Sequence, residues 1–217
     1  MKIEIDWDEE KIKKLLAFRI SRAVDRNCEK TLNFIDAWNK IFKDEPVFMG
    51  DQGKRPMNRF DFISRSTHIR PRDYVKYLQA CASAEALESD KQIISAKIIK
   101  RVDKAFSNYL KDEIIDEIQA ILPEIDMIFQ IMSQIGKQQF KVDEFKSVFD
   151  SYLENGTIEG KDVNHVLQNL YDFSVVGNQP RNPKIQPVFR YKNRESRLNL
   201  SENIAVHRGL FKSLQIL

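Results

Sequence analysis

Cysteine is scarce in this chain of 217 residues, which contains only Cys28 and Cys81. Neither belongs to a CxxC pair or stands at a zinc-type spacing from a histidine, so the sequence supports no disulfide framework and no zinc site. His68, His165 and His207 are too dispersed in the sequence to form a recognisable metal motif. We therefore expect no metal ion and interpret both cysteines as ordinary thiols on helices.

Long apolar runs are also missing, because no stretch approaches the roughly 18 to 20 residues that a membrane span needs. The first residues, MKIEIDWDEE, are acidic and lack the basic region and apolar run of a secretory leader. Charged residues make up 31% of the chain and hydrophobic residues 42%, which is typical of a globular protein. We expect a cytoplasmic protein without membrane contact.

A phosphate-binding loop is absent, although Gly50, Gly53 and Lys54 lie close together in the segment 46–56. A Walker A loop requires Ser or Thr after its lysine to hold magnesium, and Arg55 stands there instead. We predict a loop in which both glycines are turn residues. No acidic Walker B strand, parallel-sheet pattern or nucleophile elbow is recognisable either. The chain alone is therefore not expected to be an enzyme.

Helical periodicity, by contrast, extends through most of the chain. Asp6 or Asp8 can cap the first helix. Trp38 and Phe42 lie four residues apart on one face of the second helix, so we expect both rings to be buried. The pattern predicts helices over residues 8–26, 29–42, 91–110, 112–121, 123–135, 143–153 and 162–171.

Two arginines flank Pro71, which fits the first turn of a helix because no amide donor is needed there. Arg70 and Arg72 are therefore placed at a helix N-terminus, where the helix dipole disfavours cations. We expect both side chains to be exposed and to contribute little to folding. An anionic partner would offset this placement, which makes both residues candidates for binding. The structural alternative is a buried salt bridge, for example to Asp73.

The second half has the winged-helix order of three helices followed by a hairpin. Gly136 ends the first of these helices, a short strand is predicted over residues 138–142, and Asp143 caps the next helix. Two further strands are predicted over residues 173–176 and 187–191, and the polar loop between them has the composition of a wing.

Candidate contact residues in this half are of two kinds. A helical wheel exposes four polar side chains on the helix over residues 162–171, and Asn and Gln can pair with adenine edges: Asn164, His165, Gln168 and Asn169. That face has almost no Lys or Arg, whereas residues 178–217 hold eight Lys and Arg against two Glu. The candidates for phosphate contact in this basic segment are Arg181, Lys184, Arg190, Lys192, Arg194 and Arg197. Contact with a protein or support of the lid is the alternative to nucleic-acid binding, and it is the one we favour.

The order and spacing of several short motifs resemble the C-terminal half of bacterial STAND or AAA-like P-loop ATPases. The matching pieces are IDW at 5–7, LLAFRI at 15–20, AWNKIF at 37–42, RPRD at 70–73 and VHRGLFKSL at 206–214. In such ATPases a helical lid lies over the nucleotide, and an arginine at the start of a lid helix senses its phosphates. The resemblance implies this sensing role for Arg70 and Arg72. It implies ATP and Mg²⁺ only together with a P-loop domain in cis or in trans, because this chain has no phosphate loop.

These observations predict a mainly α protein with a helical lid-like domain over residues 1–110. A winged-helix-like domain with a basic C-terminal tail follows over residues 111–217. The predicted function is that of a regulatory C-terminal module of a P-loop ATPase, which contacts a protein or a nucleic acid through its winged helix. The alternatives are a free-standing winged-helix DNA-binding transcriptional regulator and an enzyme without a recognisable motif. The sequence predicts no particular oligomeric state.

Overall fold

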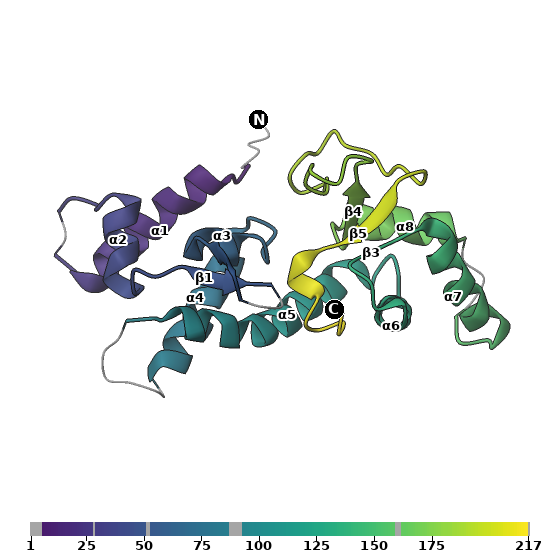
Figure 1. Cartoon of the computed structure of the whole chain (residues 1–217), viewed down its shortest axis with the longest axis horizontal. Helices are drawn as coiled ribbons and strands as arrows, with labels where there is room; N and C mark the ends of the chain where they lie inside the picture. The colour runs from purple at the N-terminus through teal and green to yellow at the C-terminus, as the bar shows by residue number, and fades with distance from the viewer. Residues whose placement is uncertain (1–5, 28, 51–52, 87–92, 159–161, 217) are drawn as a thin grey trace. The chain divides into compact units, whose positions relative to one another are not determined.

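The computed structural model describes residues 6–27, 29–50, 53–86, 93–158 and 162–216 (Figure 1). Cys28 lies outside the described residues. Two compact units make up the chain, an N-terminal unit of Met1–Phe106 and a C-terminal unit of Ser107–Leu217. Helices dominate and the sheets are small, so the structure confirms the mainly α fold class.

The N-terminal unit begins with α1 (Glu9–Val24) and α2 (Phe34–Ile41). Asp8 is the N-cap of α1, and its side chain accepts a hydrogen bond from the Lys11 amide. The second helix starts five residues later than expected, because Asn33 is its N-cap and accepts from the Asp36 amide. This unit continues through α3 (Arg59–Ser64) and α4 (Pro71–Ala86) to the first half of α5 (Ala96–Ile118).

A small hairpin replaces the loop that was expected over residues 46–56. Strand β1 (Val47–Met49) pairs antiparallel with β2 (Arg55–Met57). Gly50 and Gly53 have φ angles of 81° and 59°, in the left-handed region that glycine adopts without steric cost. Both glycines are therefore turn residues as predicted, whereas the prediction of a loop without strands was wrong.

Helix α5 is continuous where two separate helices were expected, over 91–110 and 112–121. Neither Gly nor Pro interrupts it, and apolar residues recur every four positions along one stripe. These residues are buried in both units: Ile98, Val102, Phe106, Leu110, Ile114 and Ile118. The helix therefore contributes core side chains on both sides of the boundary between the units.

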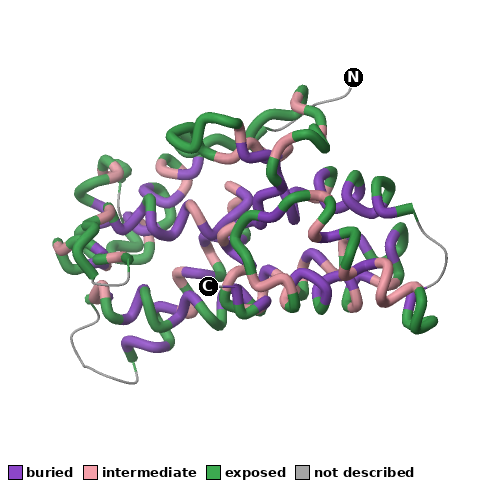
Figure 2. Tube along the Cα trace, turned by 45° about the vertical axis from the view of Figure 1, so that its right-hand side comes forward, coloured by how far each residue is buried: buried purple, intermediate pink, exposed green. Residues whose placement is uncertain are grey.

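Aromatic rings form much of the core of the N-terminal unit. Trp38 and Phe42 are 3% and 1% exposed, which confirms that both are buried. Their ring centroids lie 4.3 Å apart, and Phe60 and Tyr74 stack at 5.6 Å. Figure 2 shows buried positions along the helices of the chain.

The C-terminal unit combines α6 (Ile125–Ile135), α7 (Val142–Glu154) and α8 (Val163–Asp172) with a three-stranded antiparallel sheet. Its strands are β3 (Gln139–Phe140), β4 (Val176–Gln179) and β5 (Asn203–Val206), in the order β3-β5-β4. A short 3-10 helix, η1 (Arg208–Leu210), follows β5. Gly136 ends α6 with a φ of 64°, as predicted.

The start of α7 differs from the expected cap at Asp143. Lys141 occupies the N-cap position, and its amide donates a hydrogen bond to Glu144 Oε2 at 3.0 Å. The Glu144 side chain thus satisfies a backbone donor at the helix start. Lys137 holds the same carboxylate, and its hydrogen bond is the main reason why the pKa of Glu144 is lowered.

The strand expected over residues 187–191 is not formed, and β5 takes its place in the sheet. In that segment Val188 makes a single bridge to Asn178, while the rings of Phe189 and Tyr191 pack edge-on against His207 at 5.2 and 5.5 Å. The aromatic residues that favoured a strand therefore serve packing. The segment passes so close to Gly177 that a Cβ there would lie 2.5 Å from the Val188 carbonyl oxygen.

Candidate functional site

The start of α4 carries the two candidate nucleotide-sensing arginines. Arg72 is exposed, with 48% of its side chain accessible, whereas Arg70 is half-buried rather than exposed as expected. The Arg72 Nε atom lies 4.0 Å from Oδ1 of Asp73, whose side chain is only 2% exposed. Asp73 Oδ2 also accepts a hydrogen bond from the His68 amide at 2.9 Å. A buried carboxylate in the first turn therefore offsets part of the electrostatic cost of an arginine there.

Helix α8 presents three of its four candidate contact residues. Asn164, His165 and Gln168 are exposed. The Gln168 Nε2 atom donates to Asp172 Oδ1 at 3.1 Å, so this amide already has an acceptor within its own helix.

Asn169 was expected on the same exposed face, and that expectation was wrong. Only 9% of the residue is accessible, because it lies in the buried part of α8 with Val166 and Leu170. Its Nδ2 atom has no hydrogen-bond partner among the described residues. Asn169 is therefore removed from the contact surface.

The six candidate cations of the basic segment lie in one connection between β4 and β5, over residues 181–197, which we call the basic loop. Five of them are exposed: Arg181, Lys184, Lys192, Arg194 and Arg197. Arg190 is half-buried and forms an ion pair with Asp172 at 2.9 Å. This pair ties the basic loop to the end of α8, while the other candidate cations extend along the loop surface.

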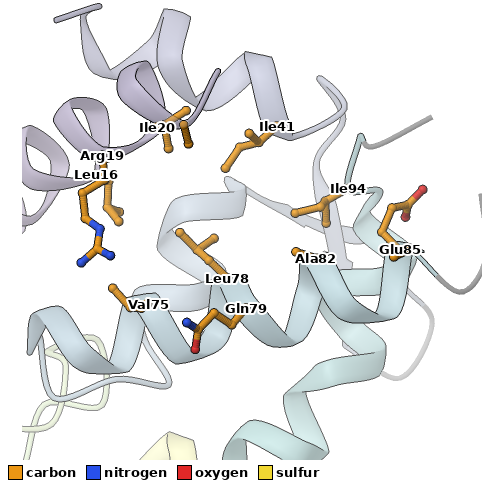
Figure 3. Close-up of a pocket in the computed structure, with 12 residues that line it drawn as sticks. Leu16, Arg19, Ile20, Ile41, Val75, Leu78, Gln79, Ala82, Glu85 and Ile94 are labelled. Carbon is orange, nitrogen blue, oxygen red and sulfur yellow. The ribbon is translucent and has the colours of Figure 1, made fainter. Parts of the chain in front are cut away.

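A groove between α1 and α4 was not predicted from the sequence. It has a volume of about 610 Å³ and is shown in Figure 3. Side chains from α1, the end of α2, α4 and the segment before α5 line it, among them Leu16, Arg19, Ile20, Leu78, Glu85 and Ile94. No single segment signals the groove, because its walls come from helices separated by more than 50 residues.

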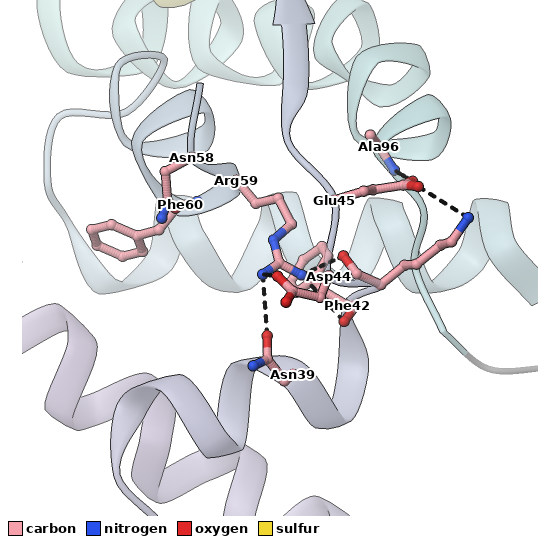
Figure 4. A network of polar contacts seen from close by, with 9 residues as sticks. Asn39, Phe42, Asp44, Glu45, Asn58, Arg59, Phe60 and Ala96 are labelled. Carbon is pink, nitrogen blue, oxygen red and sulfur yellow. Dashed lines mark hydrogen bonds and ion pairs between the residues drawn. The ribbon is translucent and has the colours of Figure 1, made fainter. Parts of the chain in front are cut away.

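Arg59 is a second feature that sequence reasoning missed. It is 8% exposed at the start of α3, and its guanidinium donates to the carbonyl oxygens of Phe42 and Lys43 (Figure 4). It also donates to Asn39 Oδ1 at 3.1 Å and to Asp44 Oδ1 at 2.9 Å. The network closes the C-terminal end of α2, so we assign it a structural role.

The carboxylate of Glu45 extends this network to α5. Its Oε1 atom accepts from the Ala96 amide at 2.8 Å, and Lys43 Nζ lies 3.0 Å from its Oε2. The hydrogen bond from the Ala96 amide is the main cause that lowers the pKa of Glu45, followed by the hydrogen bond from Lys43.

Within the described part of the chain, no group of three or more His, Cys, Asp or Glu is placed to hold a metal ion. Cys81 lies in α4, as expected of a helical thiol, and is fully buried. Burial raises its pKa to about 12. None of the described helices combines the length and the apolar character needed to cross a membrane.

Residues 10–115 match the family model of the FunZ-associated C-terminal helical domain. The match covers just under half of the chain, from the start of α1 to near the end of α5. This region is therefore similar to a helical module from the C-terminal part of a larger protein.

Curated proteins with similarity to the chain include interferon gamma of Bos taurus and of Capra hircus, each 30% identical over 105 residues. Interferon gamma of Ovis aries is also 30% identical over 105 residues. These alignments cover 48% of this chain, and the chain spans only 60% of the length of these relatives. No solved structure matches the chain.

Proposed function

We propose that the chain is the C-terminal regulatory module of a P-loop ATPase, whose nucleotide-binding domain acts in cis or in trans. The observation that carries the proposal is the match of residues 10–115 to a C-terminal helical domain. The first four helices and the start of α5 form a compact unit, as a lid-like module requires. The chain has no phosphate loop of its own, so we assign it regulation rather than hydrolysis.

Arg70 and Arg72 are the proposed nucleotide sensors in this module. Arg72 is the stronger candidate because nearly half of its side chain is accessible at the first turn of α4. An arginine guanidinium can bind a phosphate through two parallel hydrogen bonds, and the Arg72 side chain is accessible enough for such contact. The helix dipole would favour the same anion.

The test is nucleotide binding by an assembly that contains the P-loop domain and this chain. Arg72→Ala should weaken ATP binding by about tenfold, the effect of losing one charge-assisted hydrogen bond. It should leave the melting temperature of the chain nearly unchanged. Lys76→Ala is the matched control, since Lys76 is an exposed cation one turn further along α4.

Strong destabilisation of the chain by both Arg70→Ala and Arg72→Ala would contradict the sensing role. It would assign the two arginines to the fold instead, by way of the buried carboxylate of Asp73.

A free-standing winged-helix DNA-binding regulator is the second candidate. It is favoured by the C-terminal unit, where three helices accompany a β3-β5-β4 sheet and the basic loop carries five exposed cations. Phosphate contacts from the loop would provide most of the affinity, because the exposed face of α8 offers Asn164, His165 and Gln168 but no cation.

Binding to random duplex DNA at increasing salt concentration tests this candidate. Each phosphate contact contributes about one unit to the slope of log affinity against log salt. Arg194→Gln and Arg197→Gln should each reduce the slope, whereas Gln168→Ala should not change it. Affinity that is absent or insensitive to salt would favour a protein as the partner of this unit.

A further inference from the structure

The groove between α1 and α4 carries charge at its two ends and is otherwise mainly apolar. Arg19 and Glu85 are its charged lining residues, and Gln79 is the one polar neutral residue among those described. Figure 3 shows the Arg19 guanidinium beside Val75, while Glu85 lies toward the other end of α4. The two charged lining residues therefore lie toward opposite ends of the groove.

Arg19 is suited to receive an anion. The residue is exposed, and within the described part of the chain it makes no hydrogen bond or ion pair. Its guanidinium lies beside Val75, in the N-terminal half of α4. A carboxylate at this end would gain a charge-assisted hydrogen bond without displacing an existing partner.

The end of the groove near Glu85 disfavours an anionic group. Glu85 is 8% exposed and lies near the C-terminal end of α4, where the helix dipole is negative. A second anionic group placed there would face the negative end of the α4 dipole. A ligand that fills the groove is therefore expected to carry its negative charge at the Arg19 end alone.

The walls of the groove suit a slender apolar body. Leu16 and Ile20 from α1 and Ile94 from the segment before α5 are at most 6% exposed, so they form the recessed part of the lining. Ala82 and Ala86 line the same space from α4 and leave room in it.

Size argues for a small ligand as well. The lining of α4 runs from Val75 to Ala86, which corresponds to about 16 Å of helix. A volume of about 610 Å³ lies within the range of small-molecule sites.

We propose that this groove binds a single-chain aliphatic monocarboxylate, with its carboxylate at Arg19 and its chain along Leu78 and Ile94 toward Glu85. The hydrophobic effect along the chain supplies most of the affinity, and Arg19 sets the orientation. This site does not depend on the nucleotide-sensing role proposed above, because neither Arg70 nor Arg72 lines it.

Isothermal titration calorimetry of the full chain with dodecanoate tests the site, below the concentration at which the ligand forms micelles. Dodecanoate should bind more tightly than dodecanol, which lacks the anion. It should also bind more tightly than dodecanedioate, whose second carboxylate would lie at the negative end of the α4 dipole. Arg19→Gln should weaken dodecanoate binding by about tenfold and leave dodecanol binding unchanged. Arg26→Gln is the control, since Arg26 is exposed and does not line the groove.

A second pair of variants tests where the aliphatic chain of the ligand lies. Ala82→Leu fills the groove with a larger side chain at an exposed helical position, so it should abolish binding while the helix remains stable. Ser83→Leu introduces the same side chain at the neighbouring exposed position, which does not line the groove, and should leave binding intact. Dodecanoate binding that survives Ala82→Leu, that equals dodecanol binding, or that is absent up to about 1 mM would overturn the proposal.

Discussion

Replacing Arg59 should destabilise the N-terminal unit far more than removing its acidic partner Asp44. Arg59→Ala removes the donor from the carbonyl oxygen of Phe42 and one of the two donors to the carbonyl oxygen of Lys43, which keeps the Glu45 amide. A buried polar group left unsatisfied costs about 1 to 3 kcal/mol, and water can reach some of these atoms. We therefore expect the free energy of unfolding to fall by about 2 to 3 kcal/mol.

The Asp44 side of the same ion pair should contribute little. The Asp44 side chain is 85% exposed, so water screens the attraction and solvates the carboxylate in either state. Asp44→Asn should lower the free energy of unfolding by less than about 1 kcal/mol. Arg59→Lys should fall between the two, because an ammonium retains the charge but not the planar fork that reaches several acceptors at once.

Urea unfolding followed by tryptophan fluorescence measures these differences selectively. The chain has two tryptophans, Trp7 and Trp38, and both belong to the N-terminal unit. The reasoning would be refuted if Asp44→Asn were as destabilising as Arg59→Ala. It would also be refuted if Arg59→Ala changed the free energy of unfolding by less than about 1 kcal/mol, because the carbonyl contacts would then be dispensable.

Three further predictions follow from buried positions. Gly177→Ala should destabilise the C-terminal unit by about 2 to 3 kcal/mol in thermal unfolding, because the added Cβ would contact backbone, whereas Gly156→Ala has open space and should cost only about 1 kcal/mol for its positive φ. Burial raises the pKa of Tyr74 to about 12. Its contribution to the free energy of unfolding, about 2 to 3 kcal/mol, should be complete below a pH of about 10 and should be lost as the pH rises through about 12. Tyr74→Phe should flatten the fall in stability over this range, and an equal fall in both proteins would contradict it. In a Cys28→Ser background, Cys81 should react with a disulfide reagent at a pH of about 8 only after unfolding, since burial also raises its pKa to about 12; rapid labelling of the folded chain would show that the thiol is accessible.

Features that depend on neighbouring residues could be predicted from the sequence. Asp8 caps α1 through the amide three residues later, and Gly136 ends α6 with the backbone conformation that glycine favours. The burial of Trp38 and Phe42 follows from their spacing on one helical face. In each case the interacting groups lie within four residues of each other, so local patterns contain the necessary information.

The misplaced elements show where local patterns compete with tertiary contacts. The segment over residues 187–191 is rich in strand-forming residues, yet Phe189 and Tyr191 pack against His207 instead. Asn169 has a polar side chain at a position that a helical wheel exposes, but the C-terminal unit buries it. A wheel computed from one helix assumes that one side faces solvent, and it fails where other elements cover more than one face.

The candidate sites also differ in whether local sequence or tertiary contacts define them. The basic loop could be located from the sequence because its cations lie within one continuous segment of 17 residues, 181–197. Arg59 binds acceptors 15 to 20 residues away, and the walls of the groove at Arg19 and Glu85 are separated by 66 residues. An arginine that faces solvent and an arginine that is buried are the same residue type in the sequence. They differ only in the fold, where distant carbonyl groups or apolar side chains surround the side chain. The sequence therefore located the five exposed cations of the basic loop, whereas the fold was needed to separate Arg59, which holds a helix end, from Arg19, which we propose receives a ligand.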